Sequence, residues 1–413
     1  MQRALAMGQA GIVVVGAGQA GATVVEKLRQ YGYDGPLRLI GAESHPPYQR
    51  PPLSKKYLLG ELETERLFLR PLAFYADHDI DLRLGCAVTG INRARSEVHL
   101  ADDTALPYSR LVIATGSTPR RLPHAVGGSL RSVFTVRDLA DVDAMAPSFQ
   151  PGARLLIVGG GYIGLEAAAV ASVRGLEVTL IEMQDRILKR VAADETAAYF
   201  RDLHRAHGVD LREAVGLERL DATNGAVSGA HLTDGSVLEV DFCIAGIGIL
   251  PDVWLAEAAG LRIGNGISVD AQGRTSDPAI FAAGDCTCFP YRDTRVRLES
   301  VPHAIEQAEV VAAVLCGQDT EYQAKPWFWS DQYDVKLQIA GVNTGCTKTV
   351  VRHGPREGSQ SVWYFGERGL LAVDAMNDAR AYMVGKRWIE AGMTPDMDLI
   401  SDAQADLKQI AAE

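Results

Sequence analysis

The feature that most constrains this chain is a glycine-rich loop that occurs twice. "IVVVGAGQAG" at residues 12–21 and "LLIVGGGYIG" at residues 155–164 both run from a short apolar stretch into the spacing G-x-G-x-x-G. Between a strand and a helix, this spacing is typical of dinucleotide sites, where glycine lets the backbone approach a pyrophosphate at a helix N-terminus. A tight strand-to-helix turn can also use one such loop. Two loops in the same setting favour two bound dinucleotides.

Each loop lies in a β-α-β unit that ends in an acidic residue. The first unit is predicted as a strand at 11–15, a helix to about Gln30 and a strand at 36–40. The second unit is predicted as a strand at 154–158, a helix to about Arg174 and a strand at 177–182. Glu43 and Glu182 then follow the loops by roughly 20 residues, where an acid binds a ribose hydroxyl. The Glu182 carboxylate would repel a 2′-phosphate, so NADH is favoured over NADPH. Two dinucleotides on one chain indicate hydride transfer from nicotinamide to a flavin.

Composition narrows the class of protein. A length of 413 residues suggests two or three domains. The net charge of −11 argues against nucleic-acid binding, which needs clustered positive charge. No apolar run approaches the ~20 residues that span a bilayer, and the first residues lack the apolar segment of a secretion signal. The 6 cysteines are sparse, which fits a reducing cytoplasm. No membrane partner is expected.

The remaining segments complete a mixed fold. "VPHAIEQAEVVAAVLCG", residues 301–317, predicts a helix with proline in its first turn. From about residue 325, "KLQIAG", "KTVVRHG" and "SVWYFGERGLLAVDAMN" predict antiparallel strands, followed by a helix at 378–392. We therefore expect an α/β protein with two Rossmann-like dinucleotide-binding domains and a C-terminal α+β domain with an antiparallel sheet.

Three motifs make the chain resemble the two-dinucleotide flavoprotein reductases of the glutathione reductase fold: "VVVGAGQAG", "LVIATGSTPR" and "TSDPAIFAAGDC". Longer stretches are similar to the ferredoxin reductases of the putidaredoxin reductase type: "PYQRPPLSKKYL", "ESVPHAIEQAEVVAAVLCG" and "PWFWSDQYDVKLQIAG". The resemblance covers nearly the whole chain. It implies a discontinuous FAD domain at 1–113 and 245–324, an NADH domain at 114–244 and a C-terminal domain at 325–413.

The resemblance also implies site residues. Those for FAD are Gly16, Gly18, Ala20, Gly21, Glu43, Lys55, Val88, Arg137, Asp285, Val301 and Trp329. Those for NADH are Gly159, Gly161, Tyr162, Ile163, Gly164, Glu182 and Gly248. Lys55 falls beside the flavin ring with Glu166 as its carboxylate partner, and these two are the expected catalytic residues. From the residues alone, a solvated surface lysine at Lys55 and an ordinary core residue at Trp329 are the more common interpretations.

Two departures from the family pattern leave points open. Ala42 stands where relatives often have aspartate, so either the Ala42 or the Glu43 region could contact the FAD ribose. Glu309 stands where relatives can carry a basic residue, so the docking partner could differ.

Missing residues exclude some chemistry. Disulfide reductases of this fold carry a Cys-x4-Cys pair beside the flavin, but the corresponding region here, "YQRPPLSKKYLLG", has no cysteine. Cys286 and Cys288 are expected to be two packed thiols. The other four cysteines, Cys86, Cys243, Cys316 and Cys346, are expected to be ordinary buried residues. His204 and His207 have a metal-compatible spacing but no third ligand. A solvated helix face is the better interpretation for them, and no metal site is expected.

These observations and the resemblance predict an NADH-dependent, FAD-containing reductase that passes electrons to a 2Fe-2S ferredoxin. The ferredoxin would serve a haem-thiolate cytochrome monooxygenase, or alternatively a ring-hydroxylating dioxygenase. Two competing interpretations are an apoptosis-inducing-factor-like redox sensor and a peroxide or oxygen reductase. Basic residues that could dock an acidic ferredoxin are Arg66, Arg70, Arg292, Arg295, Arg297 and Lys336.

Overall fold

The computed structural model describes residues 10–410, so the expectation for the first residues lies outside the described part. Contacts between Cα atoms divide the chain into two compact units. Unit 1 comprises the described part of Met1–Gln49 with Thr64–Thr118 and Leu250–Pro326; unit 2 comprises Arg50–Glu63, Pro119–Ile249 and the described part of Trp327–Glu413. The chain changes unit within the short strands β7 (Ser117–Pro119) and β16 (Ile249–Pro251).

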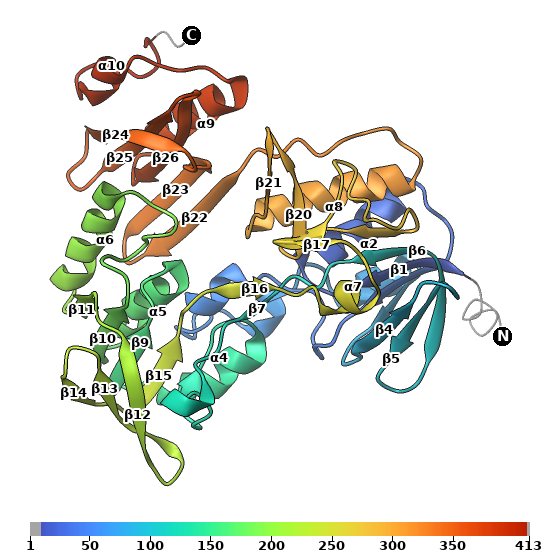
Figure 1. The fold of residues 1–413 in the computed structure, drawn as a ribbon, viewed down its shortest axis with the longest axis horizontal. Coiled ribbons are helices and arrows are strands. Elements are labelled where there is room, and N and C mark those ends of the chain that lie inside the picture. The colour runs from blue at the N-terminus through green and yellow to red at the C-terminus, as the bar shows by residue number, and fades with distance from the viewer. Residues whose placement is uncertain (1–9, 411–413) are drawn as a thin grey trace. The chain divides into compact units, whose positions relative to one another are not determined.

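Unit 1 is built on a largely parallel sheet (Figure 1). Its parallel strands lie in the order β3 (Ile80–Arg83), β2 (Leu37–Ile40), β1 (Gly11–Val15), β6 (Ala105–Ile113) and β19 (Ile280–Ala282). β5 (Glu97–Leu100) and β4 (Val88–Asn92) extend it as an antiparallel meander. Helices α2 (Gln19–Gln30) and α8 (Val301–Leu315) pack together, and their apolar residues share one buried core with β1 and β6.

Smaller elements complete unit 1. A four-stranded sheet has the order β17 (Ile263–Gly264), β18 (Gly266–Ser268), β20 (Thr287–Tyr291) and β21 (Thr294–Val296). The short helices are η2 (Thr64–Leu67), α3 (Leu72–Asp77) and α7 (Trp254–Ala258).

Unit 2 contains a second parallel sheet. Its strands have the order β11 (Asp210–Glu213), β10 (Glu177–Glu182), β9 (Arg154–Val158), β15 (Phe242–Ala245) and β8 (Val133–Phe134). Around it lie α4 (Leu139–Met145), α5 (Tyr162–Val173), α6 (Asp194–Ala206) and the antiparallel strands β12 (Leu217–Thr223), β13 (Ala226–Leu232) and β14 (Val237–Glu239). The 3-10 helices are η1 (Pro51–Ser54), η3 (His124–Val126) and η4 (Ala146–Ser148).

The C-terminal part of unit 2 is an antiparallel sheet (Figure 1). Its order is β22 (Trp327–Gln332), β23 (Val335–Gly341), β26 (Gly369–Met376), β25 (Gln360–Gly366) and β24 (Cys346–His353). α9 (Ala379–Ala391) packs on β23 and β26, where Trp363, Val373 and Trp388 are buried, and α10 (Met397–Ser401) follows. The predicted α/β class with a C-terminal antiparallel sheet is therefore confirmed.

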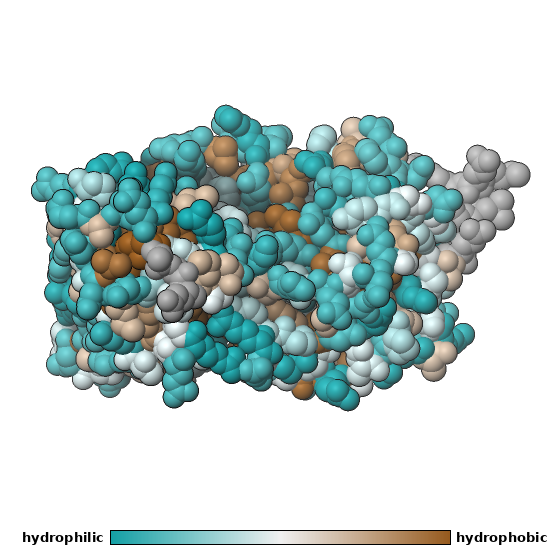
Figure 2. Space-filling model, turned by 90° about the horizontal axis from the view of Figure 1, so that it is seen from above, coloured by the Kyte–Doolittle hydropathy of each residue, from teal (hydrophilic) through white to brown (hydrophobic). Residues whose placement is uncertain are grey.

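The surface matches the composition. Most of the face in Figure 2 is hydrophilic, as expected of a chain with a net charge of −11. Among residues 10–410, no helix is long and apolar enough to cross a membrane.

Candidate dinucleotide sites

The first glycine loop follows β1 and is shaped by contacts that exclude side chains. Gly16 has a φ of +109°, and a Cβ there would lie 2.1 Å from the carbonyl oxygen of Ala114. A Cβ on Gly21 would lie 1.9 Å from the carbonyl oxygen of Gly16. Gly18 differs, since a Cβ there would meet nothing within 4 Å. The outer glycines therefore close the turn and seat the helix on the strand, and the middle glycine faces open space.

The second loop repeats this arrangement in unit 2. A Cβ on Gly159 would lie 2.5 Å from the carbonyl oxygen of Gly246, and one on Gly164 would lie 2.2 Å from that of Gly159. A Cβ on Gly161 would again meet nothing within 4 Å. Ile163, in the first turn of α5, is 42% exposed. The geometry of both loops thus fits the passage of a pyrophosphate close to the backbone.

Both helices after the loops begin without a capping side chain. α2 begins after Gly18 and α5 after Gly161, and neither of these N-cap residues forms a side-chain cap; the first turns hold no acidic residue. The free N–H groups and the positive end of each helix dipole therefore suit an anion. Ala20, in the first turn of α2, is buried.

The acidic residue of each unit lies beside its loop. Glu182, the last residue of β10, accepts hydrogen bonds from the N–H of Gly160 and from that of Gln184, each 2.8 Å long. Glu43 follows β2, and its carboxylate accepts a hydrogen bond from the Tyr48 hydroxyl. Ala42 is exposed.

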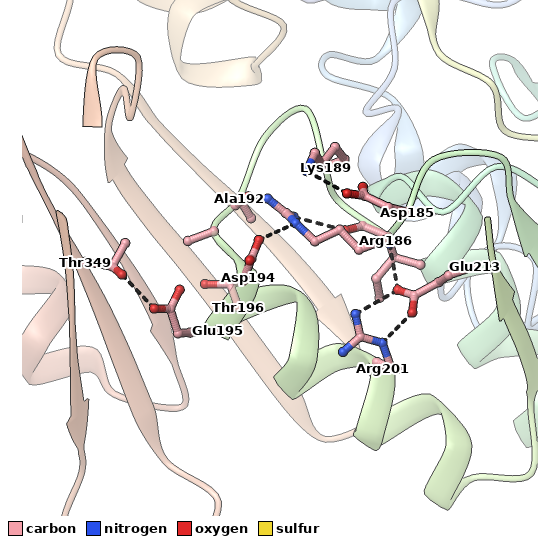
Figure 3. A network of polar contacts seen from close by, with 12 residues as sticks. Asp185, Arg186, Lys189, Ala192, Asp194, Glu195, Thr196, Arg201, Glu213 and Thr349 are labelled. Atoms are coloured by element: carbon pink, nitrogen blue, oxygen red, sulfur yellow. Dashed lines mark hydrogen bonds and ion pairs between the residues drawn. The ribbon is translucent and has the colours of Figure 1, made fainter. Parts of the chain in front are cut away.

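The polar contacts of Arg186 bear on the choice between NADH and NADPH. Its guanidinium lies 2.5 Å from an Asp194 carboxylate oxygen and donates to the Ala192 carbonyl over 2.8 Å (Figure 3). The nearby Glu213 accepts from Arg201 over 2.7 Å and from the Ile187 N–H over 2.9 Å. The cation that follows Glu182 in sequence is therefore already paired, with the first residue of α6 and with a carbonyl of its own loop.

Asp285 lies at the same sheet edge as the first loop. β19 and β1 flank β6 in parallel, so the residues that follow them meet at one edge. A Cβ on Gly284 would lie 3.1 Å from the Ala20 Cβ, which shows how close the two segments are. The Ser117 hydroxyl donates to Asp285 over 3.1 Å. Val301 opens α8, whose N-cap Ser300 accepts from the His303 N–H over 3.3 Å.

Lys55 and Glu166 form a largely buried ion pair within unit 2. The Lys55 Nζ lies 2.8 Å from Glu166 Oε1, with side-chain exposures of 17% and 3%. Two serines also donate to this carboxylate over 2.7 Å: Ser54 to Oε2 and Ser330 to Oε1. Lys55 is thus not a solvated lysine, and it follows the 3-10 helix η1 directly as its C-cap residue.

The remaining predicted residues have varied surroundings. Val88 is buried at the start of β4, and Gly248, with a φ of +97°, accepts from the Arg120 N–H over 2.9 Å. The Arg137 N–H donates to Asp141 over 3.0 Å. Trp329 is partly exposed on β22, with its ring centre 5.6 Å from that of Trp327. Tyr162 packs against Phe328 at 5.0 Å, and its buried hydroxyl finds no hydrogen-bond partner among the described residues.

The basic docking candidates are not equivalent. Arg297 pairs with Glu299 over 2.5 Å, Arg70 pairs with Glu26 over 2.6 Å, and Arg295 donates to the Val269 carbonyl over 2.7 Å. Arg66, Arg292 and Lys336 are exposed. Glu309 pairs with Lys27 over 2.9 Å.

Two expectations about the histidines and cysteines need correction. His204 is not on a solvated face: it is fully buried because Gln332 and Tyr333 pack against it. Its Nε2 lies 2.8 Å from Gln332 Oε1, and its ring centre lies 5.2 Å from that of Tyr333. His207 is exposed. Cys86, Cys316 and Cys346 are only partly buried, whereas Cys243, Cys286 and Cys288 are buried free thiols. Burial raises the pKa of Cys286 to about 11 and that of Cys243 to about 12, so both stay protonated and unreactive.

Sequence reasoning missed several residues that surround Glu166. Ser54, Ser330 and Gln332 are buried polar residues. Ser330 and Gln332 alternate along β22 and so face the same side of the strand. The available signal was that the strand changes from three aromatic residues to three polar ones, with Ser330 and Gln332 at i and i+2.

Comparison with known proteins places these sites in a family. The family described as pyridine nucleotide-disulphide oxidoreductase matches residues 10–308, and the reductase C-terminal domain matches residues 327–411. The chain is 41% identical to putidaredoxin reductase CamA of Pseudomonas putida, covering 97% of this chain and 96% of that one. It is 42% identical to the 5,5′-dehydrodivanillate O-demethylase ferredoxin reductase subunit of a Sphingobium species, covering 97% and 98%.

The solved structures agree. The crystal structure of the covalent putidaredoxin reductase–putidaredoxin complex contains a chain that matches with a TM-score of 0.94 at 40% identity, covering 97% of this chain and 98% of that chain. Enzymes of this family use FAD and NAD(P)H, which the two glycine loops fit. The chain therefore belongs to the pyridine nucleotide-disulphide oxidoreductase family, and within it to the ferredoxin reductases of the putidaredoxin reductase type.

Proposed function

We propose that the protein is a cytoplasmic NADH-dependent reductase that delivers electrons through FAD to a 2Fe-2S ferredoxin serving a haem-thiolate monooxygenase. The observation that carries this proposal is the pair of glycine loops, each open only at its middle glycine. When bound, FAD supplies the conversion of a two-electron hydride donor into two single-electron steps. The glycine loops would hold the two dinucleotides, and the Lys55–Glu166 pair, which the family resemblance assigns to catalysis, would supply a fixed cation for hydride transfer.

The preference for NADH is supported by the polar contacts around Glu182. Its carboxylate presents negative charge at the end of β10, and Arg186 is paired with Asp194. A 2′-phosphate would thus meet a carboxylate without a free guanidinium to neutralise it.

The ferredoxin partner is supported by the relatives and by missing chemistry. The relatives named for putidaredoxin and for the anthranilate 1,2-dioxygenase system are each 41% identical to this chain. The buried cysteines argue against a thiol relay. The monooxygenase assignment is favoured by the match through "WFWSDQYD", and a ring-hydroxylating dioxygenase is the second candidate.

The test is to purify the protein, reduce it with NADH or NADPH and offer a panel of 2Fe-2S ferredoxins from both kinds of oxygenase system. We expect a yellow flavoprotein, faster reduction by NADH, and rapid reduction of a monooxygenase-type ferredoxin. A colourless protein that binds no FAD would refute the proposal. Flavin reduction with no turnover of any ferredoxin would favour a redox sensor.

A further inference from the structure

A chain of buried hydrogen bonds leads from α6 through β22 to Glu166, all within unit 2. The Tyr333 hydroxyl lies 3.2 Å from His204 Nδ1, and His204 Nε2 lies 2.8 Å from Gln332 Oε1. Gln332 Nε2 lies 3.2 Å from Ser330 Oγ, which lies 2.7 Å from Glu166 Oε1. All of these residues except Tyr333 are at most 2% exposed. Removal of any link would leave a buried polar group unpaired.

The direction of every hydrogen bond follows from the chemistry of the groups. An ionised carboxylate only accepts, so Ser330 gives its single hydroxyl hydrogen to Glu166 and accepts from the Gln332 amide. Gln332 then presents its oxygen to His204, whose Nε2 must carry the hydrogen. His204 Nδ1 is left to accept from the Tyr333 hydroxyl. Every donor therefore points toward Glu166, and such a polarised chain strengthens each of its bonds.

The histidine keeps this arrangement because it stays neutral. Burial lowers the pKa of His204 to about 4, and a charge on His207 would act in the same direction. His207 itself lies outside the chain: its ring stacks on Tyr333 at 3.7 Å, and its Nδ1 lies 2.8 Å from the Leu203 carbonyl oxygen. Near neutral pH, His204 thus has one donor nitrogen and one acceptor nitrogen.

We propose that Tyr333, His204 and Gln332 are positioning residues for the Lys55–Glu166 ion pair, acting through Ser330. A buried carboxylate is stable when its oxygens are paired and its neighbours are fixed. The chain fixes the Oε1 that bonds to Lys55, and Ser54 holds Oε2. The effect on hydride transfer rests on the proposed function, whereas the hydrogen-bond chain itself does not.

The chain is tested by NMR on the oxidised holoenzyme labelled with 13C at the glutamate carboxyl and 15N in the histidine rings. We expect His204 to show a protonated Nε2 and an unprotonated Nδ1 at pH 7. The Glu166 carboxyl resonance, assigned by its loss in Glu166→Gln, should move in Ser330→Ala. It should move in the same direction but less in Gln332→Leu and least in His204→Phe, while Ser330→Thr restores it.

Thr196→Val is the matched control. Thr196 is also buried on α6 and donates to Asp374 of the C-terminal sheet over 2.8 Å, but it does not belong to the chain. The proposal is overturned if Thr196→Val moves the Glu166 resonance as far as His204→Phe does, or if His204→Phe and Gln332→Leu leave it in place. These two variants carry the test if Ser330→Ala fails to fold.

The functional consequence is measured separately by stopped-flow reduction of the bound flavin. In His204→Phe and Gln332→Leu, the rate at saturating NADH should fall several-fold, while the NADH concentration for half-maximal rate and the FAD content stay as in the parent. Displaced resonances with an unchanged reduction rate would overturn the positioning role. Failure of the proposed function would instead appear as absent FAD or absent reduction by NADH in the parent protein.

Discussion

Glu182 accepts a hydrogen bond from the N–H of Gly160 across 2.8 Å, which ties the acid at the end of β10 to the glycine loop at the end of β9. We expect Glu182→Ala to weaken NADH binding by roughly tenfold through the loss of a ribose hydrogen bond to a charged group. The discrimination against NADPH should narrow because the repelling carboxylate is gone. Steady-state kinetics with both nucleotides checks this, and parent protein that prefers NADPH would contradict it.

A second prediction concerns Arg186. In the double variant Glu182→Ala/Asp194→Asn, the Arg186 guanidinium loses its carboxylate partner, which lies 2.5 Å away in the parent. It then becomes available to a 2′-phosphate. NADPH use should therefore improve over that of Glu182→Ala alone. Lys189→Gln is the control, because its partner Asp185, at 3.0 Å, lies in the same loop (Figure 3). An equal gain with Lys189→Gln in place of Asp194→Asn would argue against a role for Arg186.

The middle glycines give a third prediction. Since a Cβ on Gly18 or Gly161 meets nothing within 4 Å, Gly18→Val and Gly161→Val should fold but obstruct their ligands. We expect Gly18→Val to be purified with little FAD, and Gly161→Val to hold FAD but reduce it slowly. Gly21→Ala is the contrasting variant, because its Cβ would lie 1.9 Å from a backbone oxygen and the fold itself should suffer. Flavin absorbance and circular dichroism distinguish these outcomes.

Asp374 should give the stability an unusual pH dependence. Burial raises the pKa of Asp374 to about 6, although the hydroxyls of Tyr364 and Thr196 donate to its carboxylate. The folded state therefore holds a proton that the unfolded chain releases between pH ~4 and 6. Stability from this group is present below pH ~4 and is lost as pH rises through 6, by on the order of 3 kcal/mol.

Asp374→Asn removes this titration. Relative to the parent, its free energy of unfolding should rise as pH increases from 4 to 7, measured by urea unfolding with a fixed excess of FAD. Glu367→Gln, an exposed change in the β25–β26 turn, is the control and should leave the slope unchanged. Parallel curves for Asp374→Asn and the parent would show that Asp374 does not titrate in this range.

The buried histidines act in the opposite direction. Burial lowers the pKa of His303 to about 4, so the unfolded chain binds a proton between pH ~6.5 and 4 that the folded state excludes. Stability from this group is present above pH 6.5 and is lost as pH falls to 4, again by on the order of 3 kcal/mol. His303→Phe should lose less stability in this range than the parent does, whereas exposed His207→Gln should match the parent.

Much of the fold follows from short-range pattern. β9 and β10 have the predicted bounds, because each is a β-branched or leucine-rich run next to a glycine turn or a helix. The glycine loops could be predicted because close backbone contact leaves no room for a side chain at four of their positions, which are Gly16, Gly21, Gly159 and Gly164.

What could not be predicted depends on contacts between distant segments. The solvated assignment of His204 failed because amphipathic spacing says which face is polar, but not that Gln332, 128 positions away, covers it. The Lys55–Glu166 pair joins segments of distant sequence, and only the family resemblance suggested it. Local pattern carries no information about such pairings.

The division of the chain also bears on how such reductases can be recombined. Arg50–Glu63 groups by contact with the second glycine loop and the C-terminal sheet, not with the sequence that flanks it. A chimera that takes only residues 327–413 from a relative would combine the relative's residues at positions 330 and 332 with the Glu166 of this chain. Recombination between such reductases would thus preserve the surroundings of Lys55 only if the three stretches of unit 2, at 50–63, 119–249 and 327–413, came from the same parent.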